Sequence, residues 1–224
     1  EVTQRNKIPL LVGGTMLYFR ALQDGLSMLP PADMNLRLAL ENSAKELGWP
    51  AMHQKLAELD PESAARIKST DSQRIQRALE VCYLTQQPMS EILKIPKQTH
   101  FPYDKISITL IPSERSQLHQ RIAKRFESML KCGLVDEVHS IRKQFSLSIV
   151  SPSMRCVGYR QACLYLDDRI SISELQDSGI AATRQLAKRQ MTWLRSMSGA
   201  ELFDSLDDSA PATVLERCGR FLQE

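Results

Sequence analysis

The 224-residue sequence has no apolar run long enough to cross a membrane, because a spanning helix needs about 18 to 20 apolar residues. Its five cysteines form no Cys-x-x-Cys pair, and its four histidines are isolated. These absences argue against a membrane protein, a disulfide scaffold and a structural zinc site. Aromatic residues make up only 6%, but 42% hydrophobic and 25% charged residues are globular proportions. We therefore expect a folded, cytoplasmic protein without a structural metal.

Motifs of catalysis are also scarce. The sequence contains neither the phosphate loop G-x-x-x-x-G-K-[ST] nor the dinucleotide fingerprint G-x-G-x-x-G. It also lacks the usual signatures of serine and cysteine nucleophiles. By motif chemistry alone, the chain offers no convincing active-site base.

Charge is unevenly distributed along the chain, whose formal net charge is +3. Residues 196–224 carry six acidic side chains and two arginines, so this tail has a net charge of −4 and the preceding residues carry +7. Such a moderately basic body is compatible with an anionic partner without requiring one.

The first residues predict a unit of an α/β fold. The apolar run at residues 8–12 ends at Gly13-Gly14, which is typical of a buried strand in a parallel sheet. The next residues predict a helix that ends at Gly25. Strand, glycine turn and helix form the building unit of α/β folds.

Residues 31–100 predict a block of helices with short connections, which we interpret as an all-helical insertion domain. Capping and proline signals mark the expected helix starts. These signals are Asp33, Pro50, Asp60-Pro61 and either Thr70 or Asp71.

The sheet resumes after this block, because residues 105–111 alternate isoleucine and leucine with serine and threonine. Helices follow at about 114–132, 134–145, 158–166 and 173–196, then a short strand at 201–204 and a closing helix. The predicted fold class is α/β, mostly helical, with a parallel-sheet core and a helical insertion. The expected domains are 1–30 (core), 31–100 (insertion), 101–200 (remainder of the core) and 201–224 (tail).

One predicted helix carries a pair of arginines that suits an anion. Arg121 and Arg125 are four residues apart, so they share one helix face and can converge on a phosphate or pyrophosphate. The alternative is a solvated basic stripe beside the apolar face.

The long helix at 173–196 is also basic. Arg184, Lys188 and Arg195 fall on one side of it, and no acidic residue occurs from 178 to 195. Such a helix can follow the phosphates of a nucleic acid, or it can simply present cations to solvent.

Two shorter segments have similar chemistry. Arg74 and Arg77 share a face of the fourth insertion helix, although an ordinary helix surface explains them more simply. Residues 153–161 combine two arginines, a glycine and a tyrosine at a helix start, which suits contacts to bases and phosphates. A capped loop is the alternative there.

Five segments of the sequence resemble one protein family. In chain order they are IPLLVGGTMLYF (8–19), DSQRIQRALE (71–80), HQRIAKRF (119–126), RCVGYRQ (155–161) and TRQLAKRQMTWLR (183–195). They are similar to segments of the bacterial tRNA dimethylallyltransferases, also called tRNA isopentenyltransferases. The resemblance implies a P-loop NTPase-like core that carries a helical insertion.

The resemblance also implies a reaction on tRNA. Family members transfer a dimethylallyl group from dimethylallyl diphosphate to the exocyclic N6 amine of the adenosine just 3′ of the anticodon, in tRNAs reading codons that begin with U. The adenosine is flipped into a channel, and the diphosphate and Mg²⁺ enter from the other side. The expected partners are therefore the tRNA anticodon stem-loop and dimethylallyl diphosphate, with Mg²⁺ as cofactor and the protein as a monomer.

Matching positions carry the family's binding roles over to this chain. Arg125 matches an arginine used on the diphosphate, and Arg121 shares its face. Thr15 matches a channel position near the target base, and Arg37 matches a tRNA-contacting position. The other expected tRNA contacts are Gln73, Arg74, Ile75, Gln76, Arg77, Arg155, Cys156, Val157, Gly158, Tyr159, Arg160, Lys188, Arg189, Gln190, Trp193 and Arg195.

The resemblance further implies residues that this sequence does not contain. The family's phosphate loop and general-base aspartate would lie upstream of Ile8, and nothing matching them precedes it here. We therefore expect an amino-terminal portion to be absent, the sheet to be incomplete with exposed apolar edges, and the chain as written to be inactive.

Two other functions stay open. One is a non-catalytic RNA-binding module, for which the coding sequence would start at or near Glu1. The other is a different phosphoryl-handling α/β enzyme, such as a small-molecule kinase, which would bind a nucleoside triphosphate and need no RNA.

Overall fold

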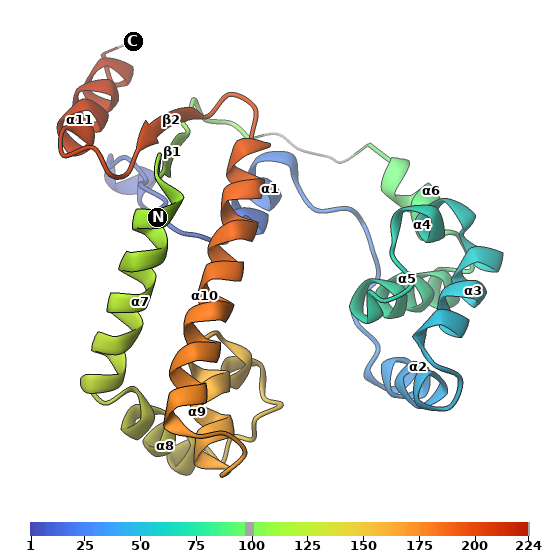
Figure 1. Ribbon diagram of the computed structural model, residues 1–224. Coiled ribbons are helices and arrows are strands. Elements are labelled where there is room, and N and C mark those ends of the chain that lie inside the picture. The colour runs from blue at the N-terminus through green and yellow to red at the C-terminus, as the bar shows by residue number, and fades with distance from the viewer. Residues whose placement is uncertain (97–100, 224) are drawn as a thin grey trace. The chain divides into compact units, whose positions relative to one another are not determined.

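The computed structural model describes residues 1–96 and 101–223, and these form two compact units. The core unit comprises Glu1–Met16 and Tyr103–Glu224, and the helical unit comprises Leu17–Pro102 (Figure 1). The sequence-based boundaries at 30, 100 and 200 stay predictions. Residues 97–100, at the predicted end of the insertion, and Glu224 lie outside the described residues.

The helical unit contains helices near the four predicted starts and one further helix, α6, that the sequence did not predict. After α1 (Met16–Asp24), which begins at the boundary between the units, come α2 (Met34–Leu47), α3 (Trp49–Leu59), α4 (Pro61–Arg66), α5 (Ser72–Thr85) and α6 (Met89–Lys94). The Asp33 carboxylate accepts a hydrogen bond from the Leu36 N–H at 2.8 Å and caps α2. Of the two candidate caps for α5, Asp71 serves, accepting from the Arg74 N–H.

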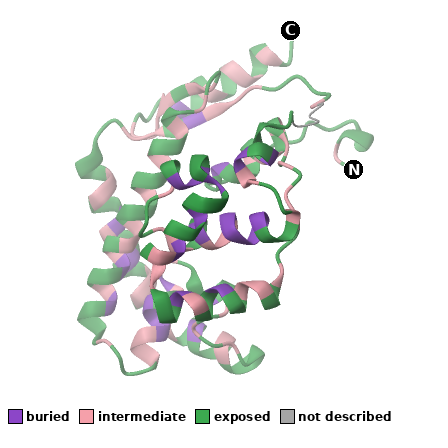
Figure 2. Ribbon diagram, turned by 90° about the vertical axis from the view of Figure 1, so that its right-hand side faces the viewer, coloured by how far each residue is buried: buried purple, intermediate pink, exposed green. Residues whose placement is uncertain are grey.

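A continuous apolar core joins α2, α3 and α5. Met52, Leu56, Ile75 and Leu79 are almost completely buried in it. Figure 2 shows buried positions recurring along the helices with exposed ones between them, as amphipathic helices require.

A buried carboxylate fixes the short helices α4 and α6. Asp60 is fully buried and accepts hydrogen bonds from the Ser63 N–H and from both the N–H and hydroxyl of Ser90, at 2.7 to 2.9 Å. Burial raises the pKa of Asp60, but the hydrogen bonds from Ser63 and Ser90 lower it below its usual value.

The core unit contains a small parallel sheet among helices. Strands β1 (Ile108–Ile111) and β2 (Glu201–Asp204) pair in parallel, with Ile108 opposite Glu201 and Ile111 opposite Asp204. The helical elements of the unit are η1 (Thr3–Arg5), α7 (Arg115–Lys131), α8 (Leu134–Phe145), η2 (Pro152–Arg155), α9 (Tyr159–Leu166), α10 (Ile172–Arg195) and α11 (Ala210–Phe221). The mostly helical α/β class and the parallel pairing are as predicted.

The long helices α7 and α10 lie side by side, with the strands at one end and α8 and α9 at the other (Figure 1). Gly179 of α10 faces the ring of Phe126, such that an added Cβ would lie only 2.0 Å from the ring's Cζ atom. Near the strands, His119 of α7 is instead close to Arg184 of α10. Because residue numbers rise along one helix as they fall along the other, the two helices are antiparallel.

Three predictions about the core unit need correction. Residues 8–12 form no strand, and Ile8, Leu10, Leu11 and Val12 are 59 to 85% exposed. A strand needs a hydrogen-bonding neighbour, and β1 and β2, the strands of the described residues, pair with each other instead.

The other two corrections concern which face is buried. On β1, Thr109 is buried and Leu110 is 54% exposed, the reverse of what apolar alternation indicates. On α10, helical periodicity predicts an apolar stripe of Leu175, Ala182, Leu186 and Trp193; Leu175 is buried, but Leu186 and Trp193 are more than a third exposed.

Candidate functional site

The arginine pair of α7 is exposed beside a buried face. Ile122 and Phe126 are buried, whereas Arg121 and Arg125 are exposed one helical turn apart. Within the residues described, no carboxylate lies within ion-pair distance of either guanidinium. Both guanidiniums therefore keep their donors for an anionic ligand.

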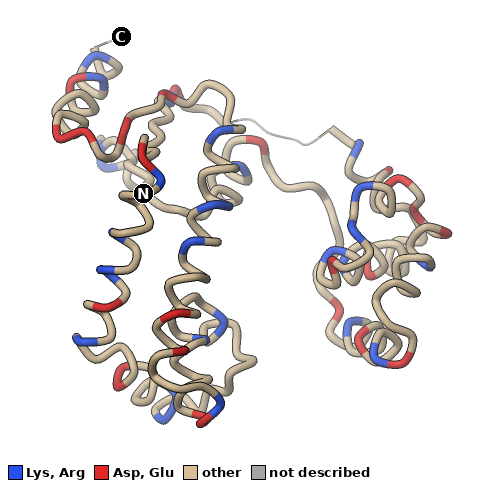
Figure 3. Tube along the Cα trace, viewed as in Figure 1, with Lys and Arg blue, Asp and Glu red and all other residues tan. Residues whose placement is uncertain are grey.

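The second half of α10 has the same character. Lys188, Arg189 and Arg195 are exposed, and none of them is paired with an acid of the described chain. Figure 3 shows lysine and arginine repeating along α7 and along this part of α10. Trp193 adds a 38% exposed aromatic side chain to the same segment.

Cationic side chains of the two helices lie close together at His119, one of the isolated histidines of the sequence. The Arg115 Nε donates to the His119 Nε2 at 3.4 Å. Loss of solvent and the positive charges of Arg184 and Arg115 lower the pKa of His119. His119 is therefore flanked by an arginine from each helix.

The glycine turn at residues 13–14 also meets α10. The Gln190 Nε2 donates to the Gly14 carbonyl oxygen at 2.9 Å, across 176 positions of sequence. Thr15 follows this turn and is exposed. Thr15, the expected channel residue, thus directly follows Gly14, which contacts Gln190 in the expected tRNA-binding stretch of α10.

The segment around α9 divides into interior and surface residues. Gly158 is buried with φ +93°, and its N–H donates to the Gln161 Oε1 at 2.9 Å. The Tyr159 hydroxyl donates to the Glu137 carboxylate, and this bond raises the pKa of Tyr159. Val157 is half-buried, and the exposed members of the predicted set are Arg155, Cys156 and Arg160.

In the helical unit, the structure brings Arg37 and Arg77 together around Glu80. The Arg37 Nε and Nη2 donate to the two carboxylate oxygens of Glu80 at 2.9 and 3.0 Å. The Arg77 Nη1 donates to the same carboxylate at 2.5 Å, and its Nη2 donates to the Pro30 carbonyl oxygen at 2.7 Å. The Glu80 side chain is completely buried.

The remaining residues of this stretch differ in exposure. Ile75 is fully buried in the core, so its side chain cannot meet a ligand at the surface, and we leave it out of the candidate contacts. Gln76 donates to the Arg37 carbonyl oxygen at 3.1 Å. Gln73 is exposed, and Arg74 is 74% exposed with an ion pair to Asp71 at 3.5 Å.

Sequence reasoning missed two structural residues of these surfaces. Glu80 could have been found in part, since Arg77 lies three residues before it on one helix. Its pairing with Arg37 spans 43 positions and has no local signal. No local signal marks Gly179 either, whose contact with Phe126 joins two helices.

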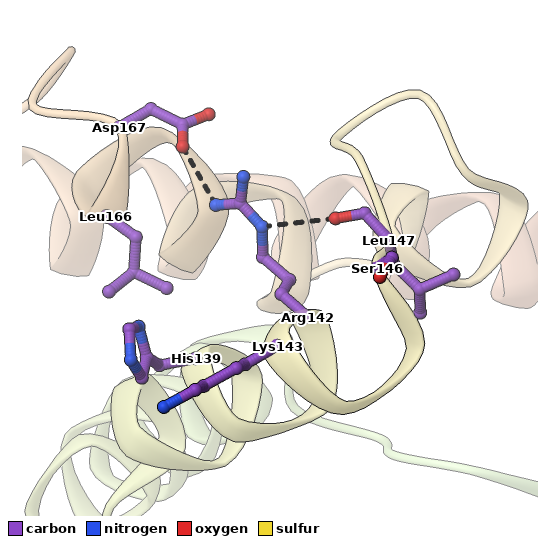
Figure 4. Close-up of a pocket in the computed structure, with 7 residues that line it drawn as sticks. All are labelled: His139, Arg142, Lys143, Ser146, Leu147, Leu166 and Asp167. Carbon is purple, nitrogen blue, oxygen red and sulfur yellow. Dashed lines mark hydrogen bonds and ion pairs between the residues drawn. The ribbon is translucent and has the colours of Figure 1, made fainter.

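A surface pocket of about 350 Å³ lies between the ends of α8 and α9 (Figure 4). Arg142 crosses it, donating to Asp167 at 2.8 Å and to the Leu147 carbonyl oxygen. The lining residues are His139, Arg142, Lys143, Ser146, Leu147, Leu166 and Asp167. None of the predicted site residues lines this pocket.

One kind of metal-binding group is absent from the described residues. They contain no group of three His, Cys, Asp or Glu side chains that could hold an ion. The expected Mg²⁺ stays a prediction, because an ion that binds mainly through substrate phosphates and water needs no such group. Over the same residues, no helix is long and apolar enough to span a membrane.

Comparison with known proteins bears on the whole chain. Residues 1–197 match the IPP transferase family. The chain is 56% identical over 216 residues to the tRNA dimethylallyltransferase of Nitrosomonas europaea, covering 96% of this chain and 68% of that protein. It is 57% identical over 214 residues to the tRNA dimethylallyltransferase of Nitrosospira multiformis, covering 96% and 66%.

Solved structures agree. The tRNA isopentenylpyrophosphate transferase of Bacillus halodurans matches with a TM-score of 0.60 and 30% identity, over 99% of this chain and 68% of that one. A eukaryotic dimethylallyltransferase acting on tRNA matches in fold, with a TM-score of 0.74 and 23% identity, over 99% and 58%. The chain therefore belongs to the IPP transferase family, as its five motifs predict.

Proposed function

We propose that this protein takes part in transfer of a dimethylallyl group from dimethylallyl diphosphate to the N6 amine of the adenosine next to the anticodon of tRNA. The supporting observation is the presence of unpaired cations on α7 and α10, in a chain 56% identical to a protein named tRNA dimethylallyltransferase. The chain spans about two thirds of the length of that relative.

The α7 arginines suit the diphosphate. In the transfer, the amine nitrogen bonds to the first carbon of the dimethylallyl group while the bond from that carbon to the diphosphate oxygen breaks. The leaving oxygen gains negative charge, and the guanidiniums of Arg121 and Arg125 would stabilise it by charge-assisted hydrogen bonds. None of the residues described here is proposed as the base that accepts the proton lost by the amine.

The exposed residues of α10, of the segment at 155–160 and of the helical unit suit the RNA. Lysine and arginine neutralise phosphates, and Tyr159 and Trp193 offer aromatic faces to bases. Thr15, beside the Gly14–Gln190 contact, would line the channel for the target base. Mg²⁺ bound together with the substrate would help to neutralise the charge on the diphosphate.

The test is nucleoside mass analysis of an anticodon stem-loop RNA incubated with dimethylallyl diphosphate and Mg²⁺. One reaction contains this chain, and a second contains the product of the complete reading frame that encodes it. We expect prenylated adenosine in the second reaction. A folded product of the complete reading frame that binds the RNA but yields no prenylated adenosine would instead support a non-catalytic RNA-binding protein.

A further inference from the structure

The helical unit contains a buried carboxylate whose partners are two candidate RNA-contacting arginines. Glu80 accepts hydrogen bonds from Arg37, Arg77 and the Asp33 N–H, the last at 2.9 Å. Its side chain is completely buried, whereas those of Arg37 and Arg77 are 36% and 30% exposed. The cluster therefore has one acid inside and two cations that reach the surface.

Each guanidinium is held along one edge and keeps a free donor on the other. Arg37 uses its Nε and Nη2 on Glu80, and Arg77 uses its Nη1 on Glu80 and its Nη2 on Pro30. Within the described chain, Arg37 Nη1 and Arg77 Nε donate to no protein atom. Arg37, Arg77 and Glu80 together carry a formal charge of +1, and the nearby Glu41 carboxylate also acts on the charge of Arg37. The free donors, rather than a net charge, are therefore what the cluster offers to an anion.

Backbone contacts fix the cluster further. Gln76 binds the Arg37 carbonyl oxygen, and Arg77 binds the Pro30 carbonyl oxygen. The start of α2 and the segment before it are thereby tied to α5. Flexible arginines on an ordinary helix surface lose side-chain entropy when they bind, whereas arginines already held in place lose less.

We propose that Glu80 is a positioning residue that holds Arg37 and Arg77 in place for the phosphodiester backbone of RNA. The inference rests on the proposed function, because it takes RNA as the partner of the helical unit. It adds a residue without RNA contact of its own, acting through the two arginines.

The Glu80→Gln variant separates electrostatics from positioning, because the two effects change RNA affinity in opposite directions. The substitution removes one negative charge, so electrostatics alone would tighten RNA binding. Loss of positioning has the opposite effect, because the amide cannot hold both guanidiniums. We expect the dissociation constant for an anticodon stem-loop RNA to rise about tenfold, with no change in the KM for dimethylallyl diphosphate in the product of the complete reading frame.

The matched control is Glu58→Gln, which makes the same charge change at an exposed position of α3. Its RNA affinity should stay equal to that of the wild type or increase slightly. Binding is measured by fluorescence anisotropy with labelled RNA at fixed salt, after circular dichroism has shown that each variant is folded.

A second pair of variants tests the proposal if Glu80→Gln does not fold. Arg77→Lys keeps the charge but loses the fork that bridges Glu80 and Pro30, whereas Arg66→Lys changes an exposed arginine of α4 outside the predicted RNA contacts. Weaker RNA binding by Arg77→Lys alone supports the proposal. Equal or tighter binding by a folded Glu80→Gln, or equal binding by the two lysine variants, overturns it. If the wild type does not bind the RNA, the proposed function fails first, and this inference fails with it.

Discussion

At the scale of single residues, Glu80 links folding to pH. Burial raises its pKa, but hydrogen bonds from Arg37 and Arg77 outweigh this and lower the pKa from 4.5 to about 2. A carboxyl group whose pKa is lower in the folded than in the unfolded state stabilises the fold above about pH 4.5, and this contribution is lost as pH falls toward 2. The difference corresponds to about 3 kcal/mol.

The difference in free energy of unfolding between the wild type and the Glu80→Gln variant should therefore be smaller in acid than at pH 7. We expect the variant to be less stable than the wild type by a few kcal/mol at pH 7, about the cost of breaking a buried pair, and this difference should shrink below about pH 4.5. The measurement is urea unfolding of both proteins from pH 7 to pH 3. A difference that stays constant down to pH 3 would show that the carboxylate is not held in its charged form by the arginines.

A second residue-scale prediction concerns Gly179. A methyl group at this position would lie 2.0 Å from Cζ and 2.6 Å from both Cε atoms of Phe126, which is itself buried. The ring cannot move without disturbing the core, so Gly179→Ala should destabilise the core unit by about 1 to 3 kcal/mol. Gly219→Ala on α11, which has nothing within 4 Å, is the control and should be neutral or stabilising. Equal urea midpoints for the two variants would contradict the close packing.

At the scale of elements, the sequence predicts those features that depend on residues close together in the chain. Asp33 and Asp71 cap helices through atoms three residues away, so their spacing alone reveals them. The strand expected at residues 8–12 depends on a neighbour elsewhere in the chain, and local pattern cannot supply one.

The candidate site divides in the same way. The exposed pair Arg121 and Arg125 follows from helical spacing. The contact of Gln190 with Gly14 and the pairing of Arg37 with Glu80 join residues 176 and 43 positions apart, so only the folded chain displays them.

The exposed face of α7 yields a prediction about substrate use. Arg125→Ala should raise the KM for dimethylallyl diphosphate about 10- to 100-fold, the loss expected for a charge-assisted hydrogen bond, while RNA affinity stays nearly constant. Steady-state kinetics of the product of the complete reading frame would measure this, with Lys131→Ala in the last turn of α7 as the control. An unchanged KM in the Arg125→Ala variant would show that Arg125 faces solvent and does not contact the diphosphate.

At the scale of the whole molecule, the chain carries +7 before residue 196 and −4 after it, so its modest net charge of +3 conceals a cationic body. RNA binding should therefore weaken steeply as salt rises, because each neutralised phosphate releases counterions. Lys188 and Arg195 lie on one side of α10 and are unpaired among the described residues, so we expect them to contribute two such contacts.

Replacing Lys188 and Arg195 by alanine should flatten the plot of log affinity against log salt concentration by about 1.4, at about 0.7 for each contact to a single strand. The matched control removes Lys55 and Lys131, which makes the same change in net charge at exposed positions outside the predicted RNA contacts. If net charge alone governed binding, both double variants would lose affinity equally and keep similar slopes. A reduced slope confined to the α10 variant would instead locate the phosphate contacts on this helix, and an unaltered slope would show that its cations are only solvated.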